Sequence, residues 1–409
     1  MHQFTAAVFA ATYLGMAFGR VPGLTLDRTG IALLGAVALL AAGVLTPTAL
    51  AHAIDFPTLA ILFGLMILSA QFAAAGFYDW CAGRIAASAG SPARLLALTV
   101  LVAGALSALL ANDIVVFAMT PLLCTGVKAR GLDARPFLAA LAGASNAGSA
   151  ATVIGNPQNI LIGQVGGLDF WAFAAVCIPP ALAALLITYV AVRIVWRAEL
   201  APTAGAARAA PPPFDRTQAA KAGIGTLVLI LLFLTPLPRE VAALVVAACL
   251  LVSRKQVTRT ITAAVDWHLI LLFIGLFAVN AAFDATGLPG RALAYLTAHG
   301  FLPDRLAVMA PLAMVLSNSI GNVPAVVMLL SLWQQAPTGA LYGLALLSTL
   351  AGNLLLVGSI ANLIVAERAG AVGVRFGFAD HVRAGLPMAL ASLALATLWL
   401  GIGGWMPWH

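Results

Sequence analysis

Polar residues interrupt two long apolar stretches of this chain, and each interruption lies near the middle of its stretch. Asn112 and Asp113 lie within 95–123, and Asn322 lies within 306–332. An unpaired carboxylate or carboxamide is costly in hydrocarbon, so a membrane protein keeps such groups where they face a cavity or a solute path. Their oxygens can ligate a cation, exchange a proton or accept a hydrogen bond from a polar solute. The pattern therefore indicates transport chemistry at two matched positions.

Two further segments, 155–159 (Gly-Asn-Pro-Gln-Asn) and 358–362 (Gly-Ser-Ile-Ala-Asn), predict breaks in membrane helices. Glycine tolerates unwound backbone, and Pro157 removes an N–H group and stops a helix. A broken helix exposes N–H groups that attract anions and C=O groups that attract cations. Hydrogen bonding between helices is the alternative role for these polar side chains. The predicted substrate- and ion-binding residues are Asn112, Asp113, Asn146, Ser149, Thr152, Gly155, Asn156, Asn159, Ser317, Asn318, Asn322, Gly358, Ser359 and Asn362.

Asp113 is the only carboxylate that the sequence places deep in the bilayer. It could exchange a proton or bind Na⁺ once per transport cycle, with Asn112 and Gly155 close to a Na⁺ site. Capping of the helix that starts at Ile114 is the alternative, and the two roles are compatible. Apart from H⁺ or Na⁺ as a coupling ion, no cofactor is expected.

The composition fixes the class of protein. The chain is 62% hydrophobic and 9% charged, whereas soluble domains carry roughly 25% charged residues. Its mean hydropathy is +1.02, which predicts an all-α polytopic membrane protein in a lipid bilayer, as in a bacterial-type inner membrane. The net charge of +7 comes without a basic patch, so no nucleic-acid partner is expected. The four cysteines lack metal-ligand spacing and no nucleophile–base pair stands out, so no enzyme is expected.

The layout that fits best has ten spanning helices and two re-entrant hairpins, 95–123 and 306–332. The stretch 95–123 is longer than one span of about 20 residues and too short for two; one long tilted helix is the alternative for it. This layout puts eighteen of the 21 Lys and Arg residues on one side and leaves Arg239, Arg291 and Arg305 on the other. The richer side is predicted to be cytoplasmic, with both termini outside. The spans are 5–19, 30–45, 57–75, 137–163 (broken), 171–195, 222–235, 241–251, 268–283, 341–366 (broken) and 386–403.

The two halves of the chain repeat. Residues 55–65 parallel 266–276, and Asn112 and Asn322 are 210 residues apart. Five spans and a hairpin per half make an odd number of crossings, so the second half is inverted relative to the first. We expect a first inverted repeat at 1–195, a cytoplasmic linker at 196–221 and a second inverted repeat at 222–409. Amphipathic stretches before the hairpins, 77–87 and 288–298, fit interfacial helices or loop anchors equally well.

At these motifs the chain resembles the ion-transporter superfamily, which includes arsenite permeases, sodium–proton antiporters and citrate transporters. Asn112-Asp113 followed by Thr120-Pro121 is similar to the arsenite-permease hairpin, and 155–159 and 358–362 are similar to the paired broken-helix motifs. The resemblance implies hairpin tips that meet broken helices around substrate and coupling ion. It also implies a homodimer whose transport part moves like an elevator against a scaffold part.

The function that we expect is secondary active transport of a small inorganic or organic anion or oxyanion, with arsenite or antimonite efflux as the sharpest hypothesis. A sodium–proton antiporter, a citrate or dicarboxylate permease and a passive channel are the alternatives. Dicarboxylate carriers have Ser-Asn-Thr at both tips, whereas 111–113 reads Ala-Asn-Asp and 321–323 reads Gly-Asn-Val. We expect no Arg or Lys at mid-membrane that could pair with a carboxylate of the solute. His268 and His381 are predicted to lie at the cytoplasmic edge.

Overall fold

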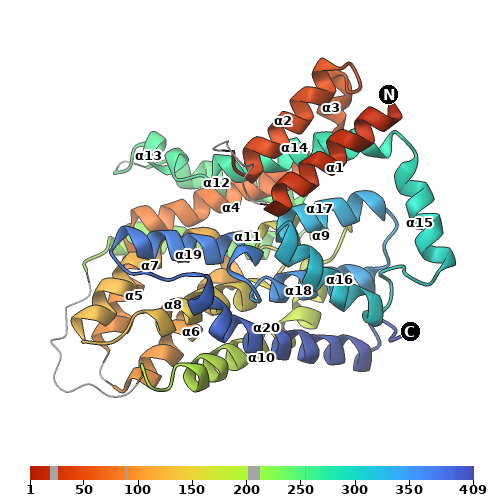
Figure 1. Ribbon diagram of the computed structural model, residues 1–409. Helices are drawn as coiled ribbons and strands as arrows, with labels where there is room; N and C mark the ends of the chain where they lie inside the picture. The colour runs from red at the N-terminus through yellow and green to blue at the C-terminus, as the bar shows by residue number, and fades with distance from the viewer. Residues whose placement is uncertain (19–25, 89, 201–211, 254) are drawn as a thin grey trace.

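A computed structural model describes residues 1–18, 26–88, 90–200, 212–253 and 255–409, which form twenty α-helices and the short 3₁₀ helix η1 (Figure 1). Five of these helices are long and apolar enough to cross a membrane: Phe56–Ala74, Pro92–Leu109, Phe170–Val195, Trp267–Asp284 and Phe378–Ile402. Four shorter apolar helices complete the set: Arg28–Ala41, Leu306–Ser319, Asn322–Leu332 and Thr338–Ala351. The all-α polytopic architecture is confirmed.

The order of helices in the first half of the chain recurs in the second. The first half contains α1 (His2–Phe18), α2 (Arg28–Ala41), α3 (Pro47–Ala53), α4 (Phe56–Ala74), α5 (Phe77–Ala87), α6 (Pro92–Leu109), α7 (Asn112–Ala129), α8 (Arg135–Ser149), α9 (Pro157–Val165) and α10 (Phe170–Val195). The second contains α11 (Arg216–Leu232), α12 (Arg239–Leu251), α13 (Thr258–Ala263), α14 (Trp267–Asp284), α15 (Leu288–Ala298), α16 (Leu306–Ser319), α17 (Asn322–Leu332), α18 (Thr338–Ala351), η1 (Leu356–Gly358), α19 (Ile360–Ala371) and α20 (Phe378–Ile402). Helices α3 and α13 are too short to register as spans in the sequence. Helix α11 begins inside the range expected to be linker, of which 201–211 lie outside the described residues.

The first hairpin bends back as expected. Helix α6 ends at Leu109 and α7 begins at Asn112, so the apolar stretch is broken at the polar residues. Arg130, just after α7, donates to the carbonyl oxygens of Ser88 (3.0 Å) and Gly90 (2.9 Å), just before α6. Both ends of the stretch therefore lie together, which excludes a single tilted helix.

Helix packing shows the symmetry of the two halves. Helix α4 packs on α12, and its counterpart α14 packs on α2; likewise α7 packs on α19, and α17 on α9. A Cβ atom on Gly64 would lie 2.8 Å from the Ala243 carbonyl oxygen, and one on Gly275 would lie 2.8 Å from the Ala32 carbonyl carbon. Gly64 and Gly275 are 211 residues apart, as are Ala32 and Ala243. Each half thus supplies the partner of the other, as a two-fold inverted repeat requires.

These close contacts make a testable packing prediction. Gly64→Val places two methyl groups where α12 backbone lies, and overpacking of this kind costs about 1–3 kcal/mol. We expect a lower thermal unfolding midpoint for purified Gly64→Val. Gly223→Val is the matched control, because no heavy atom lies within 4 Å of a Cβ atom at Gly223. Equal midpoints for the two variants would contradict the tight α4–α12 contact.

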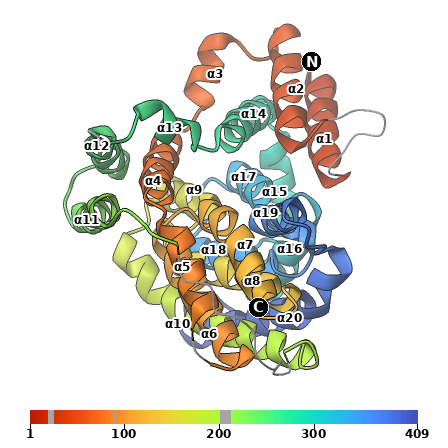
Figure 2. The same ribbon diagram turned by 90° about the vertical axis from the view of Figure 1, so that its left-hand side faces the viewer.

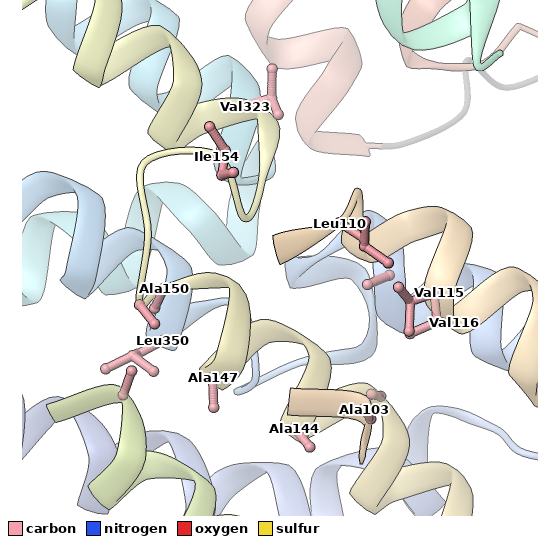
Figure 3. Close-up of a cluster of buried hydrophobic side chains, with 14 of the residues drawn as sticks. Ala103, Leu110, Val115, Val116, Ala144, Ala147, Ala150, Ile154, Val323 and Leu350 are labelled. Atoms are coloured by element: carbon pink, nitrogen blue, oxygen red, sulfur yellow. The ribbon is translucent and has the colours of Figure 1, made fainter. Parts of the chain in front are cut away.

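The helices form two layers, seen in Figure 2. The scaffold part comprises α1–α4 and α11–α14, and the hairpin part comprises α5–α10 and α15–α20. In the hairpin part, small side chains bring α6 and α8 together, as Figure 3 shows for Ala103 and Ala144. The amphipathic stretches form α5 and α15 with the expected bounds, but α5 buries five of its 11 residues whereas α15 buries only Pro289.

Candidate functional site

Both hairpin tips and both helix breaks meet at one cavity of about 30 Å³, the small cavity. The first tip supplies Asn112 and Asp113, and the second supplies Gly321 and Asn322. The cavity is completed by residues at the start of α17, of the breaks, of α8 and of the scaffold part: Arg28, Asn146, Pro157, Gln158, Leu272, Val323, Pro324, Ser359 and Ile360. Segments that the sequence marks separately, and that are up to 250 residues apart, therefore converge on one polar centre.

A second cavity of about 780 Å³, the large cavity, adjoins the first. Asn112, Asp113 and Pro157 line both cavities. The walls of the large cavity are mainly apolar side chains of α4 and α7, with Asp79, Asp266 and Arg368 as further charged groups. Asp79 and Asp266, which the sequence places near span ends, thus share this cavity with Asp113. The large cavity therefore adjoins the small cavity at the first hairpin tip.

The first hairpin tip carries two polar groups, the Asp113 carboxylate and the Asn112 amide oxygen, that have no salt bridge or hydrogen bond of their own among the described residues. Asp113 lies in the first turn of α7 and is half-buried. Among the described residues, the salt bridges do not include Asp113. Asn112 is 4% exposed, and its Oδ1 atom has no hydrogen-bond partner within the described ranges. The carboxylate of Asp113 can bind a proton or a cation, and the amide oxygen of Asn112 can ligate a cation.

Asn146 of α8 joins the two halves of the chain. Its Nδ2 atom donates to Asn353 Oδ1 (2.8 Å) and Asn362 Oδ1 (3.0 Å), and its Oδ1 atom accepts from Ser359 Oγ (2.9 Å). The side chain is 1% exposed. Because all of its amide atoms are used, Asn146 fixes the second break against the first half.

Thr349 of α18 is the counterpart of Asn146 in the other half. Its Oγ1 atom accepts from Asn156 Nδ2 (3.2 Å) and Gln158 Nε2 (3.2 Å) of the first break. Thr349 lies 203 residues after Asn146, and the two breaks are offset by the same number. Each half therefore uses the helix before its own break to hold the break of the other half.

Equivalent asparagines, Asn159 and Asn362, form the same pattern of hydrogen bonds in the two breaks. Asn159 Nδ2 donates to the carbonyl oxygens of Ser149 (3.3 Å) and Thr152 (3.1 Å). Asn362 Nδ2 donates to those of Gly352 (2.8 Å) and Leu355 (3.2 Å), which are again offset by 203 residues. These bonds satisfy carbonyl groups that the broken helices leave without intrahelical partners.

The predicted site residues fall into two groups. Six of them line a cavity: Asn112, Asp113, Asn146, Asn156, Asn322 and Ser359. The others lie behind the cavity walls: Ser149, Thr152, Gly155, Asn159, Ser317, Asn318, Gly358 and Asn362. Thr152 Oγ1 donates to the Ala108 carbonyl and Asn318 Nδ2 to the Ala351 carbonyl (2.9 Å), which ties each hairpin to its break. Of the three residues expected near a sodium ion, Asn112 and Asp113 line both cavities, whereas Gly155 lines neither of them.

Asn322 and Ser317 join the second tip to its break. With its amide oriented to satisfy its hydrogen bonds, Asn322 donates to the carbonyl oxygens of Gly358 (2.9 Å) and Ser348 (3.2 Å). Ser317 Oγ also donates to Ser348 (3.2 Å), as Ser107 Oγ donates to Ser145 Oγ (3.0 Å) in the first half. The second tip is thus bonded to its break, whereas the first tip keeps a free amide oxygen.

Arg28, the first residue of α2, adds to the site a cation that the sequence analysis did not predict there. Its guanidinium lines the small cavity and donates from Nη2 to the Val357 carbonyl oxygen (3.3 Å). Gly321, with φ +95°, makes room for it, because a Cβ atom there would lie 2.8 Å from Arg28 Nη1. Within the described residues the salt bridges do not include Arg28, so its charge is available to an anion.

His381 also differs from expectation, since it is 1% exposed. Its Nε2 atom lies 3.0 Å from the Asn353 carbonyl oxygen, behind the second break. A carbonyl only accepts, so Nε2 carries the hydrogen. The ring supports the break, whereas an interfacial histidine would face water; His268 is exposed as expected.

A multi-pass helical fold with two broken-helix repeats around a polar cavity defines the chain as a membrane transporter. The profile of the protein family described as Citrate transporter matches residues 13–341. The chain therefore belongs to the citrate transporter family, within the superfamily that its motifs resemble.

Individual relatives agree with this assignment. A silicon efflux transporter of rice, Oryza sativa subsp. japonica, is 28% identical and covers 97% of both chains. A protein of Dictyostelium discoideum named as an arsB transporter is 23% identical over 95% of this chain and 90% of its own. The crystal structure of the YdaH transporter of Alcanivorax borkumensis, described as having an unusual topology, aligns over 98% of this chain and 96% of its own. Its TM-score is 0.55 at 14% identity, so that likeness concerns the fold.

Proposed function

We propose that the chain is a secondary active transporter of a small anion or oxyanion, of the arsenite or antimonite efflux type, coupled to H⁺ or Na⁺. The observation that carries the proposal is the small cavity between the two hairpin tips, which both the Asp113 carboxylate and the Arg28 guanidinium line. The relatives named for silicon efflux and for arsB support a small inorganic solute bearing oxygen. Asp113 serves the coupling ion, and Arg28 serves the solute.

Movement of the hairpin part along the scaffold part would carry the site between the two membrane faces. Two-fold related halves give such a transporter two end states of opposite orientation. Asp266 and Ala263, which belong to the side rich in Lys and Arg, line the large cavity, so we assign the large cavity to the cytoplasmic side. A homodimer with both termini outside, and halves at 1–195 and 222–409, completes the proposal.

The test is flux into proteoliposomes that hold the purified protein. We expect arsenite or antimonite to move only when a pH or sodium gradient is imposed, and we expect this coupling to depend on Asp113. Gradient-independent current or turnover far above that of a carrier would indicate a channel. A pH-sensitive dye that reports proton movement on adding sodium alone would indicate a sodium–proton antiporter, and no flux of any such solute would overturn the proposal.

Carboxylate transport is the second candidate, and one observation favours it. Arg28 presents a planar guanidinium, whose fork of N–H groups matches a carboxylate. The family description points the same way. Citrate uptake that exceeds metalloid flux in the same proteoliposomes would select this candidate.

A further inference from the structure

Arg28 has a counterpart in the other half of the chain. Arg239 lies 211 residues later, and both arginines are the first residue of equivalent helices, α2 and α12. These helices belong to the scaffold part, and both side chains are half-buried. Within the described ranges the salt bridges include neither of them. Two arginines at the two ends of the scaffold part thus obey the two-fold symmetry of the fold.

The two arginines contact different segments of the hairpin part. Arg28 donates to the Val357 carbonyl at the start of the second break, beside the hairpin tip at Gly321. Arg239 donates instead to the carbonyls of Gly163 and Leu168, at the far end of α9. Arg28 therefore lines the small cavity, whereas Arg239 lines neither the small nor the large cavity.

The surroundings of the arginines match this difference. Arg239 borders a mostly apolar gap of about 10 Å³ with Ile61, Ile154 and Phe233. Ile61 corresponds to Leu272, which lines the small cavity beside Arg28, at an offset of 211 residues. Leu272 and Ile61 are thus equivalent residues with different surroundings. Leu272 lines the small cavity, whereas Ile61 borders the gap beside Arg239.

Exchange of the two halves gives the opposite end state. There Arg239, which already borders a gap with Ile154, the counterpart of Val357, would meet the first tip at Ala111, the counterpart of Gly321. Arg28 would then contact the far end of α19.

We propose that Arg28 and Arg239 recognise the transported anion in turn, each when the site faces its own side of the membrane. This inference rests on the transport proposed above and adds its anion-binding residues. A guanidinium at each end of the scaffold part provides positive charge where the anion is loaded and released. The site itself then needs no arginine that would travel with the anion and hold it.

Cross-linking tests the exchange without any solute. In a Cys249→Ser background, the remaining cysteines are buried. One pair of substitutions is Arg28→Cys with Val357→Cys, and the other is Arg239→Cys with Ala111→Cys, treated in lipid nanodiscs with a dithiol reagent of about one arginine length. We expect both pairs to cross-link and each cross-link to abolish movement. Cross-linking of the first pair alone would overturn the proposal.

Sided exchange of citrate tests recognition. In right-side-out and inside-out vesicles, Arg28→Gln should raise the half-saturating citrate concentration about tenfold or more on the face of the large cavity, because a charge-assisted bond is lost. Arg239→Gln should do so on the opposite face. Arg216→Gln, an exposed arginine at the first position of α11, is the matched control.

Lysine at each position should restore part of the affinity on the same face, which a merely structural role would not predict. If both glutamine variants raised the half-saturating citrate concentration on the same face, or equally on both faces, the proposal that the two arginines bind the anion in turn would be overturned. If the wild type exchanges no citrate, anion transport fails for this probe, while the cross-linking result still decides whether the arginines exchange.

Discussion

Asp113→Asn abolishes ion-coupled transport and leaves the fold intact; this is the largest functional effect that we expect. Asparagine keeps the shape of the side chain but can neither carry a proton nor supply a negative charge to Na⁺. The salt bridges of the described residues do not include Asp113, so we expect a stability change within about 1 kcal/mol. Coupled flux should fall by about two orders of magnitude, the equivalent of about 3 kcal/mol of lost ion binding.

The measurement is flux in proteoliposomes across a range of pH, together with the thermal unfolding midpoint. Asp79→Asn is the matched control, because Asp79 lines the large cavity but not the small one. We expect Asp79→Asn to keep most of the flux and its pH dependence. Flux of Asp113→Asn with the same pH dependence as wild type would remove Asp113 from the mechanism.

The hairpins and breaks could be predicted because their signal is local. Asn112 and Asn322 each interrupt an apolar run, and an amide in such a run is explained by a tip or a cavity. Pro157 and the neighbouring asparagines mark a helix start, and Asn156 indeed caps α9, accepting from the Asn159 N–H at 2.9 Å. Capping depends on residues within one turn, so the sequence is sufficient.

The contacts between halves could not be predicted in this way. Thr349 belongs to an apolar helix and looks like a packing residue, yet it accepts hydrogen bonds from Asn156 and Gln158, 193 and 191 residues away. Nothing local tells which helix faces a break. The repeat offset of 203 residues, which also separates Asn146 from Thr349, is the signal that could have paired them.

Arg28 was missed because its neighbours in sequence are those of a charged loop. Asp27 caps α2, with the Gly30 N–H at 2.8 Å, so the segment resembles an ordinary solvated helix start. Only packing of α2 on α14 brings the guanidinium to the second tip. The same reasoning misplaced His381, three residues into a helix that follows a charged loop, because burial depends on α20 lying behind the second break.

Asn146→Asp should produce the largest loss of stability. The amide Nδ2 donates to two amide oxygens, of Asn353 and Asn362, and an aspartate oxygen would face both as a third acceptor. The position is 1% exposed, and an uncompensated buried charge costs about 3–5 kcal/mol. We expect a strongly lowered thermal unfolding midpoint and no transport. Thr349→Val, the counterpart without charge, removes one hydroxyl and should cost about 1–3 kcal/mol.

The pH dependence separates charge from shape in this comparison. Protonation of the introduced aspartate restores neutrality and one donor, so the midpoint of Asn146→Asp should move toward that of wild type as the pH falls. Thr349→Val has no new titratable group and should show a constant difference from wild type. An Asn146→Asp protein as stable as wild type at neutral pH would mean that Asn146 does not hold the second break. In that case the two halves would have to be joined by other contacts, such as the close packing of α4 on α12 and of α14 on α2.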